Sequence, residues 1–493
     1  MVKRPGRAFA FLARFAALAA LAGLSACGGG TRSTGGMTEQ LARCRAESAH
    51  IYDAASFDDY ISRVRATARR CGIGSTGLAA LSGLERRADL DGEPRFPVGL
   101  NPQLAALPRG EYRSGTVNPT RKYVEDRVEQ LGEKGRGLLD QHRTLLKRVE
   151  ARYGVPAEYI VAFWGVETNF GGFTGNHDVV ETLANLGHGA SRRKFFTEEL
   201  LGALILLDRG LVRRGFKGSY AGAFGHAQFM PTSYIQNAVD FDGDGRADLF
   251  GSLPDVFASI ANYEVQRGRW DARVGGAIFE VRLPREFNFE EADIESRRDV
   301  GYWVGQRVTY PNGARLAGNL GQSAILLPAG CDGPAFMVTQ NFYAIMDYNP
   351  LVEYAMAVSM LAETMKTGEY RLTKAWPEED ALSSADRARL QEMLNRRGHG
   401  ELNVDGRLGR ESRAAVRRAQ ASLGQCADGY ATASLLDALD RGTSRYARDA
   451  ERETRTDARP TPPRTTAART TTTRKTRKTG LFPAYAGTRS RRR

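Results

Sequence analysis

Apolar residues recur at spacings of three and four along much of the chain, which is the period of an amphipathic helix. The pattern runs from Met37 to about Leu84, for example at Phe57, Tyr60 and Val64. It therefore predicts a helical N-terminal region.

The same period continues through the middle of the chain. A charged stretch from Tyr123 to Tyr153 predicts one long helix, and Gly154 and Pro156 stop and restart the pattern, with Pro156 suited to a first helical turn. Helical patterns extend to Leu211 and return from Tyr343 to Met365. We expect these helices to form most of one domain.

Short β-like runs interrupt the helices at Val274–Leu283 and Val308–Tyr310, and predict a small sheet. Residues 91–120 are rich in Pro and Gly and predict an irregular connection, residues 366–386 predict a linker, and residues 387–440 predict a compact module. The fold class expected is predominantly α, of the α+β type.

The N-terminus has the pattern of a secretion signal over residues 1–26. Four basic residues precede the run Phe15–Leu24, which is too short to span a bilayer as a helix. Leu24-Ser25-Ala26-Cys27 resembles the lipobox of bacterial lipoproteins, which implies lipidation of Cys27 and, with Gly28 next, sorting to the outer membrane; residues 27–36 then form a flexible tether. The alternative is an ordinary cleaved signal followed by a chance Cys. Both interpretations indicate export, and the lipoprotein resemblance implies a periplasmic protein that is lipid-anchored to the outer membrane of a Gram-negative-type envelope.

Four of the five cysteines remain once Cys27 is assigned to lipid, and an exported chain favours disulfides. We expect Cys44 to pair with Cys71, and Cys331 with Cys426, while two other pairings stay open. No CxxC motif or His cluster accompanies them, so a zinc site is not expected.

The formal net charge of +13 lies almost entirely at the C-terminus. Residues 441–493 hold 16 Lys and Arg against 4 Asp and Glu, so the rest of the chain is near neutral. This Thr-, Arg- and Pro-rich tail lacks the residues for a core and is expected to be disordered in isolation. We therefore expect no nucleic-acid function, and we hypothesise that the tail binds anionic surfaces of the envelope.

Tyr159–Gly172 is the most informative segment for chemistry. An apolar, aromatic helix carries the carboxylate of Glu167 near its end, beside Asn169, Phe170 and two glycines. A carboxyl group among aromatic side chains has a raised pKa, as a general acid at neutral pH requires. The alternative is an acid on the solvent face of an ordinary helix.

A second segment, Ser219–Ser233, combines small residues with Gln228 and Phe229. Small residues let a saccharide approach the backbone, the Gln228 amide can donate and accept hydrogen bonds, and Phe229 can provide an apolar wall. The alternative is a packed glycine-rich turn.

The motifs GVETNFG, GAFGHAQFMPTSY and ANYE, in this order, resemble the membrane-bound lytic transglycosylase B family, glycoside hydrolase family 103. The resemblance covers residues 37–372. It implies a lysozyme-like fold and cleavage of the β-1,4 bond between N-acetylmuramic acid and N-acetylglucosamine in peptidoglycan, without water, leaving 1,6-anhydromuramic ends. It also implies that Glu167 acts alone, first as acid and then as base, and that no organic cofactor is needed.

The resemblance further implies a set of substrate-binding residues near Glu167. They are Ser219, Gln228, Tyr263, Tyr348, Asn349 and Tyr354, together with the paired arginines Arg192 and Arg193. The chain has Gly225-His226-Ala227-Gln228 where the family usually has Gly-Tyr-Gly-Gln.

The run Asp240–Arg246, DFDGDGR, has the side-chain spacing of the first half of an EF-hand loop. Oxygens of Asp240, Asp242 and Asp244 and the carbonyl of Arg246 are candidate Ca²⁺ ligands. Gly251 stands where an EF-hand has Glu, and the resemblance implies a later carboxylate, for which Asp255 is the candidate and Asp248 the second choice. The expected ion is structural, and the alternative is a solvated acidic turn.

Residues 387–440 contain two Asp-Gly turns between short amphipathic segments, and resemble the three-helix peptidoglycan-binding domain of cell-wall enzymes. A Cys331–Cys426 disulfide would clamp this domain to the catalytic one. The sequence thus predicts a lipid-anchored lytic transglycosylase that binds peptidoglycan strands. The alternatives are a hydrolytic muramidase and an inactive peptidoglycan-binding lipoprotein.

Overall fold

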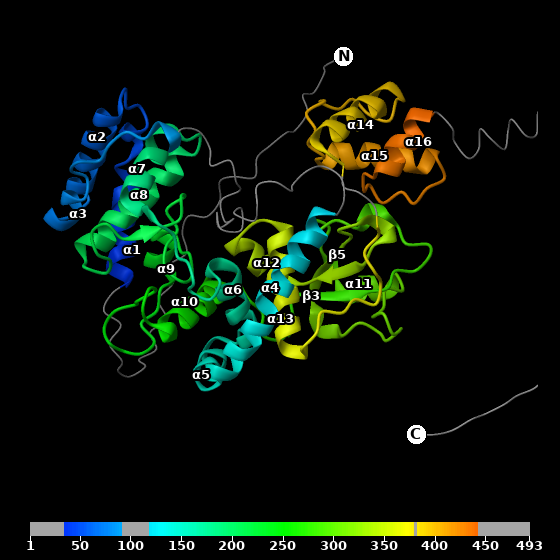
Figure 1. Ribbon diagram of the computed structural model, residues 1–493, viewed down its shortest axis with the longest axis horizontal. Coiled ribbons are helices and arrows are strands. Elements are labelled where there is room, and N and C mark those ends of the chain that lie inside the picture. The colour runs from blue at the N-terminus through cyan, green and yellow to red at the C-terminus, as the bar shows by residue number, and fades with distance from the viewer. Residues whose placement is uncertain (1–33, 91–117, 379–381, 442–493) are drawn as a thin grey trace, which may run out of the picture. The chain divides into compact units, whose positions relative to one another are not determined.

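The computed structural model describes residues 34–90, 118–378 and 382–441 (Figure 1). Helices dominate these residues, as the apolar periodicity predicts, so the α-rich class is confirmed. The helices are α1 (Thr34–Ala46), α2 (Phe57–Arg70), α3 (Ser75–Ala79), α4 (Pro119–Gln141), α5 (Arg143–Tyr153), α6 (Ala157–Thr168), α7 (Val179–Gly189), α8 (Arg193–Asp208), α9 (Pro231–Asn237), α10 (Leu253–Gln266), α11 (Val300–Gly305), α12 (Gln340–Tyr348), α13 (Val352–Thr367), α14 (Ser384–Arg396), α15 (Arg410–Ser422) and α16 (Ala433–Arg441).

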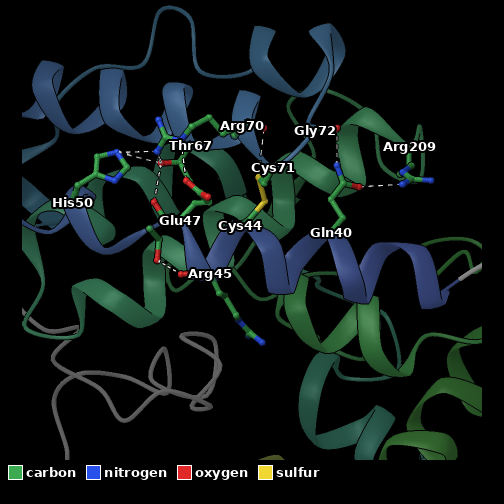
Figure 2. The surroundings of a disulfide bond; sticks show 12 residues. Gln40, Cys44, Arg45, Glu47, His50, Thr67, Arg70, Cys71, Gly72 and Arg209 are labelled. Atoms are coloured by element: carbon green, nitrogen blue, oxygen red, sulfur yellow. Dashed lines mark hydrogen bonds and ion pairs between the residues drawn. A yellow bond between two sulfur atoms is a disulfide. The ribbon is translucent and has the colours of Figure 1, made fainter.

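Helices α1, α2 and α3 pack on α7 and α8, and a disulfide joins α1 to the end of α2 (Figure 2). Cys44 of α1 is bonded to Cys71, which ends α2, with their Cα atoms 5.0 Å apart. Nearby, Nε2 of Gln40 donates to the carbonyl of Gly72 at 2.8 Å. The structure thus contains the expected Cys44–Cys71 pair, in the core of this region.

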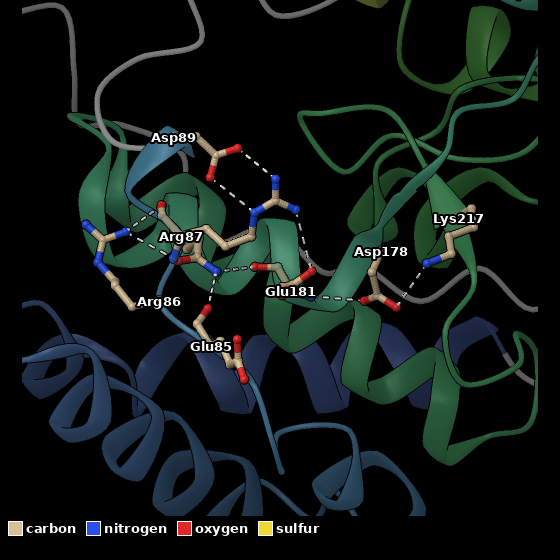
Figure 3. A network of polar contacts seen from close by, with 8 residues as sticks. Glu85, Arg86, Arg87, Asp89, Asp178, Glu181 and Lys217 are labelled. Atoms are coloured by element: carbon tan, nitrogen blue, oxygen red, sulfur yellow. Dashed lines mark hydrogen bonds and ion pairs between the residues drawn. The ribbon is translucent and has the colours of Figure 1, made fainter.

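A polar network holds the start of α7 (Figure 3). The Asp178 carboxylate accepts from the backbone N–H of Glu181 at 3.1 Å, and Lys217 lies 3.8 Å from Asp178. Arg87 pairs with Asp89 at 2.7 Å and approaches Glu181 at 3.8 Å. These partly exposed pairs add little stability individually. Together they fix the strand that leads into the glycine-rich segment.

Two antiparallel sheets are present in the described residues. The smaller pairs β1 (His177–Asp178) with β2 (Lys217–Gly218). The larger has the order β3 (Ile278–Val281), β6 (Ala335–Val338), β5 (Gln322–Leu326), β4 (Arg298–Asp299). Only the first of these strands lies in a predicted β-like run, and the sheet covers its own apolar cluster around the fully buried Trp303.

The stretch from Tyr123 to Tyr153 forms two helices, so the prediction of one long helix is wrong. His142 separates α4 from α5, and its ring packs edge-on against Trp164 and Phe257 at centroid distances of 6.2 and 5.8 Å. Pro156 stands one residue before α6 rather than in its first turn. Helix α6 packs against α4, α5, α10 and α13, which makes it the central element of this region.

The C-terminal module comprises α14, α15 and α16 around an apolar core of its own. It begins earlier than residue 387, because Leu382 belongs to this core and Ser383 forms a capping box with Asp386 at the start of α14. Cys426 is bonded to Cys331, as expected, and Asp428 accepts a hydrogen bond from the backbone N–H of Cys331 at 2.7 Å.

No helix within the described ranges has the length and apolar character to cross a bilayer. The expected lipidation site Cys27, the signal and tether, most of the 91–120 connection and residues 442–493 of the basic tail lie outside the described residues.

Candidate active site

Glu167 lies in the last turn of α6 and is 5% exposed. The helix ends at once, because Asn169 and Phe170 adopt left-handed φ angles of 50° and 59°. Such angles are uncommon for residues with side chains and cost conformational energy. Gly165 permits this ending, since a Cβ there would lie 2.7 Å from the Phe170 ring. The backbone therefore places an acid at a tightly closed helix end.

Burial raises the pKa of Glu167 to about 8, and a hydrogen bond from the Tyr354 hydroxyl to Glu167 Oε1 at 2.5 Å opposes that rise. Tyr354 belongs to α13 and is 1% exposed. Glu167 therefore holds its proton at neutral pH, while the hydroxyl is placed to stabilise the carboxylate once the proton has left. The arrangement suits a group that acts first as an acid and then as a base.

Aromatic rings from α6, α10 and the glycine-rich segment pack around Tyr348 of α12, and with Glu167 and Tyr354 these residues form the Glu167 cluster. The Tyr348 ring lies 4.9 Å from that of Phe163, 4.7 Å from that of Tyr263 and 5.9 Å from that of Phe229. The Tyr348 hydroxyl donates to the carbonyl of Ala227. The structure thus joins two of the expected binding residues, Tyr263 and Tyr348, to the glycine-rich segment.

Phe229 and Asn349 are buried in the structure. Phe229 is 2% exposed and packs on Tyr263 and Tyr348, so it supports those rings from the core. Asn349 ends α12 and its Oδ1 accepts from the backbone N–H of Leu351 at 3.2 Å. Contact of either residue with substrate stays a prediction.

The glycine-rich segment is held by hydrogen bonds to its own backbone. The Ser219 hydroxyl accepts from the backbone N–H of Ala221 and Ala223 at 3.3 and 3.1 Å. Gln228 has a left-handed φ of 47°, and its Nε2 donates to the carbonyls of Thr174 and Gly225, both at 3.0 Å. Both expected polar residues are therefore fixed in position before any ligand binds.

His226 connects this segment to α6. Its Nδ1 accepts from Trp164 Nε1 at 3.1 Å, and the two rings stack with an interplanar angle of 13°. The Thr168 hydroxyl donates to the His226 carbonyl at 3.1 Å. Burial lowers the pKa of His226, so the ring is neutral at neutral pH.

Arg192 and Arg193 lie at the start of α8 and are exposed. The Arg192 guanidinium lies over the Phe195 ring at 4.2 Å, and Arg193 donates to the Tyr52 carbonyl at 3.5 Å. Within the described residues, no contact joins them to the Glu167 cluster. Their role in binding stays a prediction.

Two residues of α4 near the Glu167 cluster, Tyr123 and Arg127, were not predicted from the sequence. Tyr123 is largely buried, and burial, with a contribution from the charge of Glu167, raises its pKa to about 12. The guanidinium of Arg127, 1% exposed, lies 4.8 Å over the Tyr123 ring. Val124, Arg127 and Leu131 share one face of α4, and this spacing is the signal that would have placed Arg127 inside.

The acidic loop brings three carboxylates together. Oxygens of Asp240, Asp242 and Asp244 lie within 4.8 Å of one another. Asp240 also accepts from the backbone N–H of Gly243 at 2.7 Å and of Gly245 at 2.9 Å, which wraps the loop around it. This is an oxygen-rich donor set of the kind that Ca²⁺ prefers.

Asp255 lies beneath the loop rather than within the three-carboxylate group. It is fully buried, and its oxygens accept from the backbone N–H of Phe241 at 2.7 Å and of Asp248 at 2.8 Å. Asp255 therefore connects the two ends of the loop by hydrogen bonds. Its role as a Ca²⁺ ligand stays a prediction.

Comparison with known proteins gives two family matches. Residues 56–363 match the transglycosylase SLT domain, and residues 383–439 match a putative peptidoglycan-binding domain. The chain is 34% identical over 229 residues to membrane-bound lytic murein transglycosylase B of Escherichia coli strain K12, over 46% of this chain and 61% of that protein.

Solved structures of similar chains agree with these matches. The crystal structure of SltB3 from Pseudomonas aeruginosa with NAG-anhNAM-pentapeptide has 38% identity and a TM-score of 0.68, over 78% of this chain and all of that one; a complex of SltB3 with NAG-NAM-pentapeptide matches equally well. Soluble lytic transglycosylase SltB1 from the same organism has 28% identity and a TM-score of 0.50, over 62% of this chain and 98% of that one. The expected lysozyme-like fold class is thereby confirmed.

Proposed function

Because the chain belongs to the transglycosylase SLT domain family, we propose that it is a lytic murein transglycosylase. It cleaves the β-1,4 bond between N-acetylmuramic acid and N-acetylglucosamine without water and leaves 1,6-anhydromuramic ends. The single observation that carries this proposal is Glu167, buried, with a pKa raised to about 8 and a hydroxyl donor on its oxygen. Its substrates include peptidoglycan strands that carry stem peptides, the class represented by the ligands of SltB3.

Glu167 acts twice in the mechanism, first as a proton donor and then as a proton acceptor. The carboxyl group donates it to the glycosidic oxygen, the bond from that oxygen to the muramic C1 breaks, and the substrate's N-acetyl group stabilises the cationic carbon. The carboxylate, hydrogen-bonded by Tyr354, then accepts the proton of the muramic 6-hydroxyl, and the oxygen of that hydroxyl bonds to C1. The acid is regenerated and no water is consumed.

The state of a nearby acid favours a mechanism with one carboxylate. Hydrolytic glycosidases use a second carboxylate as nucleophile or base. Glu264 interacts electrostatically with Tyr348 of the same aromatic cluster, but burial raises its pKa well above the usual range. The raised pKa favours the protonated form of Glu264, which serves neither as nucleophile nor as base.

Solubilisation of purified peptidoglycan tests for catalysis. Wild type should release soluble fragments, and Glu167→Gln should reduce the rate at least about 100-fold, since a positioned acid contributes 10²–10⁴-fold. Unchanged solubilisation by Glu167→Gln would refute the role of Glu167. No solubilisation by either protein, with binding retained, would favour an inactive peptidoglycan-binding lipoprotein.

We assign residues 383–439 to holding the enzyme on the cell wall, on the basis of their family match. The Cys331–Cys426 disulfide and the Asp428 hydrogen bond to Cys331 join this module to the catalytic part.

We further propose that the enzyme is periplasmic and anchored to the outer membrane by a lipid on Cys27. The lipobox-like Leu24–Cys27 and the membrane-bound relative support this anchor. Cys27→Ser should move the protein from the membrane fraction to the soluble fraction, and an unchanged distribution would contradict it.

We also propose a structural Ca²⁺ in the acidic loop, held by Asp240, Asp242 and Asp244 and the Arg246 carbonyl, with Asp255 as the further carboxylate. The clustered oxygens support it, because at these distances the carboxylates repel one another without a cation. Chelation should lower the melting temperature and added Ca²⁺ should restore it. A melting temperature that changes with neither chelation nor added Ca²⁺ would contradict the site.

The basic tail is proposed to bind anionic envelope surfaces, an attraction that salt screens. The full chain should bind anionic vesicles at low salt more tightly than a chain ending at Asp440. Equal binding by the two would contradict this role.

A further inference from the structure

A pocket of about 350 Å³ lies at the end of β3, where residues 327–335 and 373–374 meet it. Within the described residues it contains none of the side chains of the Glu167 cluster. Part of the pocket lining is apolar. That part comprises Leu283, Pro284, Phe289, Pro311 and Leu327.

The lining also contains three cationic side chains. They belong to Arg282, Arg285 and Lys374, and across the described ranges none of the three has a carboxylate partner within ion-pair distance. Lys374 Nζ instead donates to the carbonyl of Cys331 at 2.6 Å. Within the described residues, the pocket thus holds three positive charges without an ion-pair partner.

The single carboxylate of the lining is already engaged. The oxygens of Glu280 accept from the backbone N–H of Thr373 and of Lys374, both at 2.8 Å. Glu280 therefore positions the segment that carries Lys374 and offsets only part of the positive charge. A carboxylate ligand would find charge complementarity in this pocket.

The backbone beneath these cations is fixed. Arg282 exchanges two hydrogen bonds with Thr309, at 2.8 and 3.1 Å, which extend the pairing of β3. Beyond it, Pro284 accepts from the backbone N–H of Phe287 at 3.2 Å and closes the turn that contains Arg285. The two arginines therefore stand on a rigid support, which lowers the entropic cost of binding a ligand.

We propose that this pocket is a subsite for a short, carboxylate-bearing peptide, namely the stem peptide of a peptidoglycan strand. The cations bind the peptide's carboxylates, and the apolar lining residues contact its small aliphatic side chains. This inference rests on the proposed function for the identity of the peptide, and it adds a site that recognises the stem outside the Glu167 cluster.

Binding of the free pentapeptide, cut from NAG-NAM-pentapeptide, tests the subsite by calorimetry on the full chain. Saturating peptide-free NAG-anhNAM is present throughout, so that the catalytic cleft is filled. The Arg282→Ala/Arg285→Ala variant should bind the peptide at least about tenfold more weakly, since two charge-assisted contacts are lost. Arg214→Ala, which removes an exposed arginine outside the pocket, should bind like wild type.

Equal affinity of the double variant and wild type would overturn the proposal. So would equal binding of inorganic phosphate and peptide at this site, because that result would indicate an unselective anion patch. A pentapeptide with its carboxylates amidated should bind no better to wild type than to the double variant.

Activity on glycan strands stripped of peptide separates this proposal from the proposed function. The double variant should cleave such strands at the wild-type rate, and its loss should appear only on peptide-bearing strands. If wild type itself fails to cleave either substrate, the proposed function falls, while the peptide-binding result still decides the pocket.

Discussion

Glu167 meets two requirements that normally conflict, because it must hold a proton at neutral pH and also become a stable carboxylate during the reaction. Burial meets the first by raising the pKa to about 8, and the Tyr354 hydroxyl meets the second. Both conditions arise from α6 and α13 packing side by side. Each can be tested with a single substitution.

Glu167→Gln should stabilise the protein at alkaline pH. The folded-state pKa is raised from 4.5 to about 8, so wild-type stability is full below about pH 4.5 and falls as pH rises towards 8, by up to about 1.4 kcal/mol per pH unit. Gln carries no proton to lose. Thermal melts should show a variant advantage that is near zero at pH 4.5 and grows to pH 8, whereas a constant difference would contradict the raised pKa.

Tyr354→Phe should move the alkaline limb of the kcat/KM profile to higher pH. The hydroxyl lowers the pKa of Glu167, so its removal raises that pKa and keeps the acid protonated over a wider range. The maximal rate should fall about tenfold, because the carboxylate loses its donor. Tyr302→Phe, at a 36% exposed tyrosine, is the matched control. A limb that stays in place would show that Tyr354 is merely structural.

Glu264 is fully buried, and neither carboxylate oxygen has a hydrogen-bond partner within the described residues. Glu264→Met, of similar volume, should raise the free energy of unfolding at pH 7.5 by on the order of 1 kcal/mol or more. Glu129→Met, at an exposed position of α4, should change it by less than about 0.5 kcal/mol. Destabilisation by Glu264→Met would show that this acid has a needed partner.

At the scale of elements, close backbone approaches hold the glycine-rich segment against the end of α6. Gly175 has a φ of 102°, and a Cβ there would lie 2.0 Å from the carbonyl carbon of Gly218. Its neighbour Thr174 supplies the carbonyl that binds Gln228. The position of Gln228 thus depends on a glycine far from it in sequence.

Gly175→Ala should destabilise the protein by about 3 kcal/mol and also reduce kcat/KM, because the β1–β2 contact must open. Gly313→Ala is the control, since it has a φ of 82° with no atom within 4 Å of the added Cβ. It should cost only about 1 kcal/mol. Equal losses in chemical denaturation of the two variants would contradict the close contact.

The sequence allowed the main helices and the acid to be predicted where local pattern determines them. The apolar run ending at Glu167 forms a helix, and burial of that run buries the acid, which is one of the two interpretations that the sequence left open. The break at His142 could not be predicted, because no Gly or Pro marks it and the cause is packing on Trp164 and Phe257. Local sequence patterns determine which segments form helices, whereas packing between residues distant in sequence determines where those helices end.

The residues of the candidate site also fall into those that the sequence predicts and those that it does not. Family motifs located Gln228 and Tyr354, but nothing local shows that Phe229 faces the core or that Asp255 binds backbone N–H groups. Each of these facts depends on residues brought from another element. Composition and spacing contain no information about them.

At the scale of the whole molecule, charge and chemistry are separated along the chain. The excess positive charge belongs to residues 441–493. In the described catalytic part, the side chains packed around α6 are mostly buried and carry little net charge. The wall-binding module and the proposed peptide pocket both lie outside the Glu167 cluster. On these proposals, the protein holds its substrate at points other than the Glu167 cluster as well as at that acid.

The most direct test of the central claim is mass spectrometry of the products formed from purified peptidoglycan by wild type and Glu167→Gln. The single-acid mechanism predicts fragments with 1,6-anhydromuramic ends from wild type, and none above background from the variant. Fragments with reducing ends, each heavier by one water, would show a hydrolytic muramidase and contradict the mechanism.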